Sequence, residues 1–310
     1  MKKKILAGLL VTALLVFAVG CGKTTTEATT ADTTTTDTAA TDSTATDTTA
    51  TDATATDATT DAAATDAAPT ENITLVGLAD TTPHTELIEF VEPILAAEGI
   101  TIDLVGNAAD ATWNEKVEDG EVDFAFFAHW PYVQEYNETN DGHLVNAGNI
   151  HIEPIAAYSD KYTSVDQVPD KAKVVIPNDA TNEYRALLIL QKAGFIKLND
   201  NLSGLAATVD DIAEYTKPIE IVELDAAQII GVAQDFDIYI VNTNKALEAG
   251  IDTTKYLFRE DTDSPYANII EVKEGRENDY AIKKLVEALQ SEDVRKFIED
   301  KYKGAVIPAF

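Results

Sequence analysis

The sequence predicts an α/β protein of two lobes with a ligand cleft between them, preceded by a disordered N-terminal segment. Segments with strand character alternate with helical segments, which is typical of helices that cover a mostly parallel sheet. This alternation occurs in residues 73–138 and again in residues 173–272. Residues 22–70, in contrast, consist almost entirely of Thr, Asp and Ala, and contain no apolar residue larger than Ala apart from Pro69.

The N-terminus has the pattern of a secretory signal. Three Lys residues at positions 2–4 precede an apolar run over residues 5–19, which is too short to span a membrane. Small residues then lead to Cys21, the only Cys in the chain and therefore no part of an internal disulfide. We expect residues 1–20 to be a lipoprotein signal peptide, and Cys21 to carry acyl chains such as palmitate that hold the chain on the extracytoplasmic side of the cell membrane. The alternative is an ordinary signal peptide cut nearby, because Ala18 stands where lipobox motifs more often carry Leu.

Residues 21–70 are expected to form a disordered tether. An Asp recurs every five residues between Asp32 and Asp57, a spacing that matches neither a helix nor a strand. So few apolar side chains cannot offset the entropy lost on folding, and the repelling carboxylates should keep the segment extended. A cation-binding role is the alternative, although isolated Asp residues at this spacing are weak ligands.

The first half of the folded part has a β-α-β-α-β pattern. A helix opens near Pro83 and carries apolar side chains on one face, and Gly99 stands where a helix C-terminal cap belongs. We expect strands over residues 73–78, 102–105 and 124–127, and helices over residues 83–98, 114–119 and 131–138.

The second half repeats this pattern. Its expected strands cover residues 173–177, 219–222, 237–241 and 269–272, and its expected helices cover residues 182–193, 226–234 and 245–249. Ile282, Leu285 and Leu289 form the apolar stripe of a further helix, and Ser291 is a candidate N-cap for the last one. We expect residues 71–155 with 264–310 to form lobe 1 and residues 156–263 to form lobe 2.

Charge and motifs exclude several functions. The chain has a formal charge of −31, of which −8 falls in residues 22–70 and +3 in residues 2–4, leaving −26 for the rest. So acidic a protein is a poor partner for nucleic acid, whose binding depends on basic contacts to phosphate. The sequence has no G-x-S-x-G elbow, no H-E-x-x-H motif and no paired Cys residues, so we expect no catalytic residue, metal or cofactor.

An aromatic cluster is the first candidate binding element. Phe127, His129, Trp130 and Tyr132 follow one another at the end of a predicted strand, where ligand crevices of α/β sheets open. Rings of this kind suit an apolar or sulfur-bearing side chain, since thioethers make favourable contacts with aromatic rings. The alternative is that these residues only pack in the core.

Polar residues that follow other predicted strands are further candidates. Arg185 lies in a strand-to-helix turn and could hold a carboxylate through two parallel hydrogen bonds, although a surface ion pair is the alternative. Asn242 follows one strand and Asn268 opens another, and their amides offer both donors and acceptors to an amino-acid backbone. Each of these residues alone is more often part of ordinary loop chemistry.

Together these segments resemble the MetQ/NlpA family, the methionine-binding lipoproteins of ABC importers. The resemblance covers nearly all of residues 73–310. Its most specific stretches are Pro83–Leu95, Phe127–Tyr132, Ile152–Pro154, Ile176–Asn182, Leu187–Gly194, Asp263–Asn268 and Lys301–Phe310.

The resemblance implies a two-lobed periplasmic-binding-protein fold of type II that closes on an L-amino acid and delivers it to the permease and ATP-binding subunits of an importer. It implies ligand contacts for Phe127, His129, Tyr132, Arg185, Asn242 and Asn268. Departures from the family pattern at Asp110, Trp113, Trp130 and Tyr184 could alter specificity, as could Ala125 and Ala128, which stand in place of amides. Methionine is therefore the leading ligand, and another amino acid, a dipeptide or a methionine derivative is the alternative. A surface enzyme or adhesin is the alternative from another class.

Overall fold

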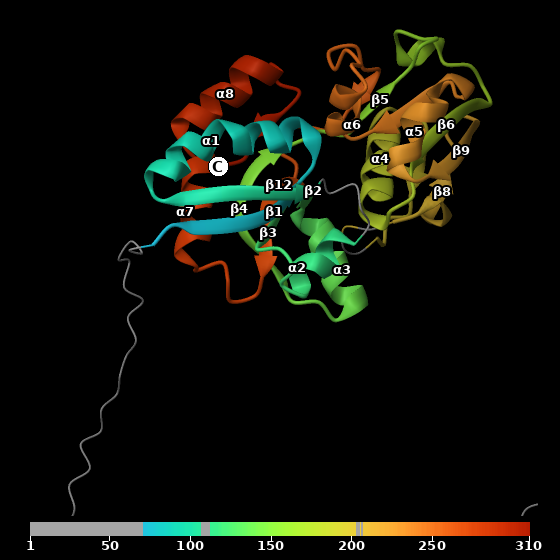
Figure 1. Ribbon diagram of the computed structural model, residues 1–310. Helices are drawn as coiled ribbons and strands as arrows, with labels where there is room; N and C mark the ends of the chain where they lie inside the picture. Colours follow the sequence, from blue (N-terminus) through green and yellow to red (C-terminus); the bar gives the residue numbers. More distant parts are fainter. Residues whose placement is uncertain (1–70, 107–111, 203–204, 206) are drawn as a thin grey trace, which may run out of the picture. The chain divides into compact units, whose positions relative to one another are not determined.

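A computed structural model describes residues 71–106, 112–202, 205 and 207–310. The predicted signal peptide, Cys21 and the predicted tether lie outside these residues. All the described elements belong to one compact unit, which lies within residues 63–310. Two sheets with helices against them build this unit, which confirms the predicted α/β class (Figure 1).

The first sheet has six strands in the order β13-β4-β12-β3-β1-β2. β1 pairs in parallel with β2 and β3, and β12 runs antiparallel to both β3 and β4. Its strands are β1 (Ile73–Ala79), β2 (Ile100–Gly106), β3 (Phe124–His129), β4 (Leu144–Ile152), β12 (Ala267–Lys273) and β13 (Ile307–Pro308).

Helices cover both faces of this sheet. Side chains of successive strand residues point to opposite faces, so Phe124 and Phe126 pack in one core cluster and Ala125 packs in another. The first cluster is closed by α1 (Glu86–Ala97), α7 (Tyr280–Leu289) and α8 (Glu292–Tyr302), and the second by α2 (Trp113–Glu118) and α3 (Trp130–Asn140). A kinked segment, Thr81–Thr85, precedes α1, and Thr82 within it has an extended backbone conformation.

The second sheet has five strands in the order β11-β5-β10-β6-β9. β6 pairs in parallel with β9 and β10, and β5 runs antiparallel to β10 and β11. Its strands are β5 (Ala156–Tyr158), β6 (Ala172–Pro177), β9 (Ile219–Leu224), β10 (Ile238–Val241) and β11 (Phe258–Arg259), and its helices are α4 (Ala180–Lys192), α5 (Ala226–Val232) and α6 (Thr243–Glu248). A small hairpin of β7 (Lys197–Leu198) and β8 (Ile212–Glu214) packs beside it.

The chain crosses between the two sheets twice, after β4 and again between β11 and β12. The two crossings are tied together, because the N–H of Glu260 donates to the carbonyl of Ile155 at 3.0 Å. The N–H of Ile155 in turn donates to the Glu260 carboxylate at 3.3 Å. These hydrogen bonds hold the two crossings side by side.

Local signals in the sequence are confirmed at several element ends. Ser291 caps α8 by accepting a hydrogen bond from the N–H of Val294 at 3.3 Å. Gly99 follows α1 with a φ of +76°, a conformation that glycine adopts without steric strain. Six strands of the described part were not expected from the sequence: β4, β5, β7, β8, β11 and β13.

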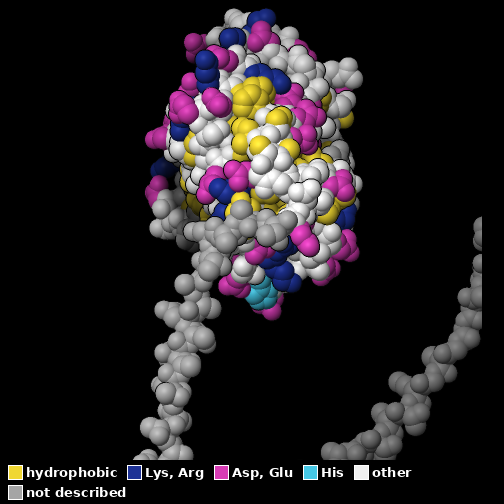
Figure 2. Space-filling model, turned by 60° about the vertical axis from the view of Figure 1, so that its left-hand side comes forward, with side chains coloured by type: hydrophobic (Ala, Val, Ile, Leu, Met, Phe, Trp, Pro, Cys, Tyr) yellow, Lys and Arg dark blue, Asp and Glu magenta, His cyan; other side chains and the backbone are white. Residues whose placement is uncertain are grey.

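The outer surface of the unit is acidic, as its composition requires. Asp and Glu side chains are spread over much of the face in Figure 2, with Lys and Arg side chains between them. None of the helices within the described residues combines the length and apolar character needed to cross a bilayer.

Gly77 is required by close packing between two strands of the first sheet. It pairs with Phe124, and a Cβ at Gly77 would lie 2.3 Å from the tip of the buried Phe124 ring. We expect Gly77→Ala to lower the free energy of unfolding by about 1–3 kcal/mol, as overpacking does. Gly231→Ala, at an exposed position of α5 with nothing within 4 Å of the added Cβ, is the control and should stabilise the protein slightly. Urea unfolding measures both, and equal behaviour of the two variants would contradict the packing argument.

Glu271 is a buried acid whose charge state should make stability depend on pH. It is 1% exposed, its two carboxylate oxygens form no well-aligned hydrogen bond within the described residues, and burial raises its pKa from 4.5 to about 8 against a smaller opposing contribution from the Trp113 side chain. Between these pH values the folded state holds a proton that the unfolded state has lost, so stability falls as the pH rises from about 4.5 to 8.

The variant Glu271→Gln removes this titration and leaves the size of the side chain unchanged. We compare the free energies of unfolding of the variant and of the unaltered protein at each pH. The difference should shift in favour of the variant by at least about 1 kcal/mol from pH 5 to pH 9. Urea unfolding at both pH values measures this, with the exposed Glu220→Gln as the control. A stability difference that is the same at both pH values would contradict the expectation.

Candidate ligand-binding site

A pocket opens at the carboxyl ends of strands from both sheets. Its volume is about 230 Å³, below the range of roughly 300–1,000 Å³ typical of sites for drug-sized ligands, which suits a smaller molecule. Its walls include all six residues for which the resemblance implies ligand contacts: Phe127, His129, Tyr132, Arg185, Asn242 and Asn268.

Aromatic rings form one wall of the pocket. The rings of Trp113 and Tyr132 stack with centroids 5.5 Å apart, and Phe127 meets Trp113 edge-on at 5.1 Å. Strand alternation explains this wall, because Phe124 and Phe126 are fully buried in the core while half-buried Phe127 faces the pocket. Ala128, the small residue beside it, also lines the pocket.

Arg185 is buried at the back of the pocket and is held on several sides. Its Nε and Nη2 donate to the two carboxylate oxygens of Glu260 at 3.2 and 2.6 Å. Nη2 also donates to the backbone carbonyl of Glu153 at 2.8 Å. Since Glu153 and Glu260 lie on the two crossings between the sheets, Arg185 joins both crossings to α4.

Three donors from three elements converge on a single oxygen in the pocket. Arg185 Nη1 from α4, Asn242 Nδ2 after β10 and His129 Nε2 at the end of β3 lie 3.0, 2.9 and 3.2 Å from Oδ1 of Asn182. The Nδ1 atom of His129 accepts the N–H of Tyr132 at 3.2 Å, so its proton is on Nε2. Burial and the charge of Arg185 lower the pKa of His129 to about 3 and keep the ring neutral. An amide oxygen has two lone pairs, so these three donors can serve a further acceptor.

A buried carboxylate also lines the pocket. Glu153 is 3% exposed and lines the pocket, and its Oε2 accepts the N–H of Asn244 at 2.9 Å. Burial raises its pKa. Glu153 was not among the candidates from the sequence, although a carboxylate between Ile152 and Pro154 at the end of an apolar stretch is a detectable signal.

An ion pair links the two sheets beside the pocket. Asp80, which follows β1, accepts hydrogen bonds from Lys245 Nζ at 2.9 Å and from Asn244 Nδ2 at 3.0 Å, both in α6. Lys245 and Asn244 line the pocket. Burial raises the pKa of the Asp80 carboxyl, but the charge of Lys245 and the other interactions hold it below its ordinary value. Neither Asp80 nor Lys245 was a candidate from the sequence.

The residues proposed to alter specificity do not all line the pocket. Trp113 lines the pocket, whereas Trp130 and Tyr184 are partly buried against neighbouring cores and do not. Asp110 lies outside the described residues. Ala125 is fully buried and pairs with Glu271 across β3 and β12.

Comparisons with known proteins agree with this geometry. Residues 75–310 match the sequence model of the family described as NlpA lipoprotein. The chain is 35% identical over 240 residues to the methionine-binding lipoprotein MetQ of Bacillus subtilis, covering 76% of this chain and 87% of the relative.

Two solved structures are similar in fold and sequence. A lipoprotein from Ruminococcus gnavus superimposes with a TM-score of 0.73 at 43% identity, covering 76% of this chain and 99% of the other. A nutrient-binding protein from Burkholderia cenocepacia bound to methionine gives a TM-score of 0.72 at 36% identity, covering 77% of this chain and all of the other. The names of the family and of these relatives describe lipoproteins and binding proteins.

Proposed function

Because the chain belongs to the NlpA lipoprotein family, we propose that it is an extracytoplasmic solute-binding protein that captures L-methionine for an ABC importer. The names of its relatives support methionine as the ligand. The observation that carries the proposal is the convergence of three N–H donors on one amide oxygen in a pocket that also holds a carboxylate and an aromatic wall.

The donors suit the carboxylate of an amino acid. A carboxylate accepts about four hydrogen bonds and has no donor when it is ionised. Arg185 Nη1, His129 Nε2 and Asn242 Nδ2 have only the oxygen of Asn182 in common, and each can direct an N–H at a ligand oxygen. Glu260 already neutralises much of the charge of Arg185, so we assign the carboxylate to the whole group of donors rather than to the guanidinium alone.

Glu153 suits the ammonium group. Among the described residues it forms no ion pair with Lys or Arg, and its nearest partners are His rings and a backbone N–H. A buried carboxylate is costly unless a cation or several donors meet it. The ammonium of an amino acid bound with its carboxylate at Arg185 supplies that cation.

The aromatic wall suits the side chain of methionine. Trp113, Phe127 and Tyr132 offer ring faces and edges, and a thioether sulfur gains about 0.3–1.5 kcal/mol from contact with a ring. A larger polar ligand, such as a methionine derivative or a dipeptide, is favoured by one observation. Lys245 and the exposed Asp225 line the pocket beyond the groups that a zwitterion needs.

The N-terminal segment completes the proposal. Cys21 is the attachment point of the lipid after removal of residues 1–20, and residues 21–70 form the tether between the membrane and the binding unit. Residues 71–155 with 264–310 are lobe 1 and residues 156–263 are lobe 2. The partners are the permease and ATP-binding subunits of the importer.

Calorimetric titration of the purified protein tests this function. The probes are the common L-amino acids, methionine sulfoxide and dipeptides that contain methionine, and native mass spectrometry of the protein as isolated identifies any ligand that co-purifies. We expect L-methionine to bind most tightly. A strong response to another ligand with none to methionine would overturn the assignment of methionine. Turnover of a bound compound would favour an enzyme instead.

A further inference from the structure

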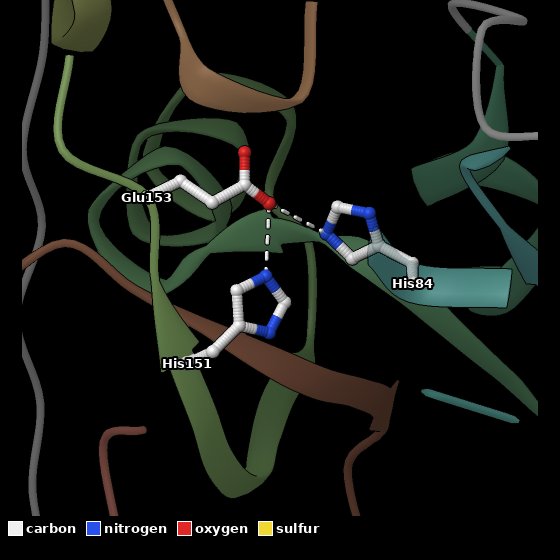
Figure 3. A group of neighbouring side chains, drawn as sticks. All are labelled: His84, His151 and Glu153. Carbon is white, nitrogen blue, oxygen red and sulfur yellow. Dashed lines mark hydrogen bonds and ion pairs between the residues drawn. The ribbon is translucent and has the colours of Figure 1, made fainter. Parts of the chain in front are cut away.

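Two His rings and one carboxylate form a buried group behind the pocket wall. Figure 3 shows His84 and His151 both directing a ring nitrogen at the same oxygen of Glu153. His151 Nε2 lies 2.8 Å and His84 Nε2 lies 3.3 Å from Oε1 of Glu153. Both rings are 0% exposed and the Glu153 side chain is 4% exposed, so water competes little for these contacts.

A metal ion is one reading of this group. The three potential ligand atoms lie within 4.8 Å of one another, and Zn²⁺ accepts imidazole and carboxylate ligands. A ring that binds a metal through Nε2 carries its proton on Nδ1, and such rings almost always donate that N–H to a partner. Within the described part of the chain, the Nδ1 atoms of His84 and His151 are buried without a partner. Metal binding would leave two buried donors unsatisfied, so the geometry disfavours it.

The same Nδ1 atoms indicate which nitrogens carry the protons. A buried ring nitrogen without a partner is better tolerated as a bare acceptor than as a donor, because an unsatisfied donor is the rarer case in proteins. The protons of both rings then lie on Nε2, where Oε1 of Glu153 accepts them. His84 Nε2 also lies 3.3 Å from Oδ1 of Asn268, a second acceptor, which agrees with this assignment.

Glu153 therefore receives three donors, and its carboxylate forms no ion pair with a Lys or Arg of the described residues. Two are the ring N–H groups and the third is the backbone N–H of Asn244, at 2.9 Å from Oε2. These donors favour the charged form of the carboxylate, against the burial that raises its pKa, and they fix its direction. The Glu153 carboxylate is directed at the pocket, because Glu153 is part of the pocket lining.

We propose that His84 and His151 are positioning residues that hold the Glu153 carboxylate toward the ligand's ammonium group, and so make the pocket select amines over ligands that lack one. This inference rests on the proposed function. Neither ring lines the pocket, and each acts through Glu153. Removing one ring should therefore weaken the ammonium contact and leave the contacts of the ligand's carboxylate and side chain unchanged.

Calorimetry with two ligands tests this role. L-Methionine and 4-(methylthio)butanoate differ by the ammonium group, so the ratio of their Kd values measures its contribution. We expect a ratio on the order of 100 for the unaltered protein, as for a charge-assisted contact. His151→Leu should lower it about tenfold, mainly through weaker methionine binding. His151→Gln, which retains a donor near the Nε2 position, should keep the ratio within about threefold.

The control is His143→Leu, because His143 is 58% exposed and outside the pocket, and the ratio should not change. If His151→Leu does not fold, His84→Leu replaces it. An unchanged ratio in the Leu variant, or a Gln variant that behaves like Leu, would overturn the inference alone. Zn²⁺ binding that His151→Leu abolishes would also overturn it, in favour of a metal site. Failure of the unaltered protein to bind methionine would overturn the proposed function together with the inference.

Discussion

Replacing Arg185 with Ala is expected to lower both methionine affinity and the stability of the ligand-free protein. The guanidinium is 1% exposed and its partner Glu260 is 12% exposed, so the change leaves a nearly buried carboxylate without its cation. Removing one partner of a buried pair lowers the free energy of unfolding by about 3–5 kcal/mol. The loss of Nη1 from the donor group should also weaken methionine binding by about tenfold or more.

Two controls separate charge from geometry in this experiment. Arg185→Lys keeps the charge but cannot form the paired hydrogen bonds with Glu260, so its stability should lie between those of Arg185 and the Ala variant. Lys192 lies on α4, as Arg185 does, and forms an exposed ion pair with Asp261. Lys192→Ala breaks this pair and should change stability by at most about 1 kcal/mol. Urea unfolding and calorimetry measure the two effects. Unchanged methionine affinity in Arg185→Ala would remove Arg185 from the ligand site.

Glu153→Gln is expected to lower methionine affinity while leaving the stability of the ligand-free protein nearly unchanged. The side chain keeps its size but loses the negative charge, so the ligand's ammonium group loses its counter-ion. Breaking a buried charge pair in this way weakens binding by about 2–5 kcal/mol. The ligand-free protein should change in stability by less than about 1 kcal/mol, because relief from a buried charge offsets the poorer fit of the amide to the surrounding donors.

The comparison of stability with affinity makes this variant informative. Arg185→Ala should lower both quantities, whereas Glu153→Gln should lower affinity and spare stability. The same calorimetry and urea unfolding apply to both proteins. A Glu153→Gln variant that binds methionine as the unaltered protein does would show that the ammonium group lies elsewhere.

Much of the fold was predictable because its elements carry local signals. The strands β1, β3, β6, β9 and β10 are short apolar runs, and Ser291 and Gly99 mark helix ends by their own chemistry. β4 was missed because Asn146, Gly148 and Asn149 interrupt its apolar pattern. It is a strand because β12 and β13 pair with it on either side, a tertiary condition that no local window contains.

The candidate site was predictable to the extent that its residues follow strands. Phe127, His129 and Asn242 stand at strand ends, where the rule for α/β crevices applies. Glu260 and Lys245 carry no such signal, because each acquires its role from a partner more than 70 residues away in the chain. The sequence likewise did not predict the buried pairing of Arg185 with Glu260. The alternative of a surface ion pair for Arg185 is wrong, because its side chain is buried.

A crystal structure of the protein with L-methionine is the most direct test of the zwitterion-binding arrangement. It should place the ligand's carboxylate within about 3 Å of Arg185 Nη1, His129 Nε2 and Asn242 Nδ2. The ammonium should lie against Glu153 and the thioether against Trp113, Phe127 and Tyr132. Methionine bound in the reverse orientation, or outside this pocket, would contradict the arrangement.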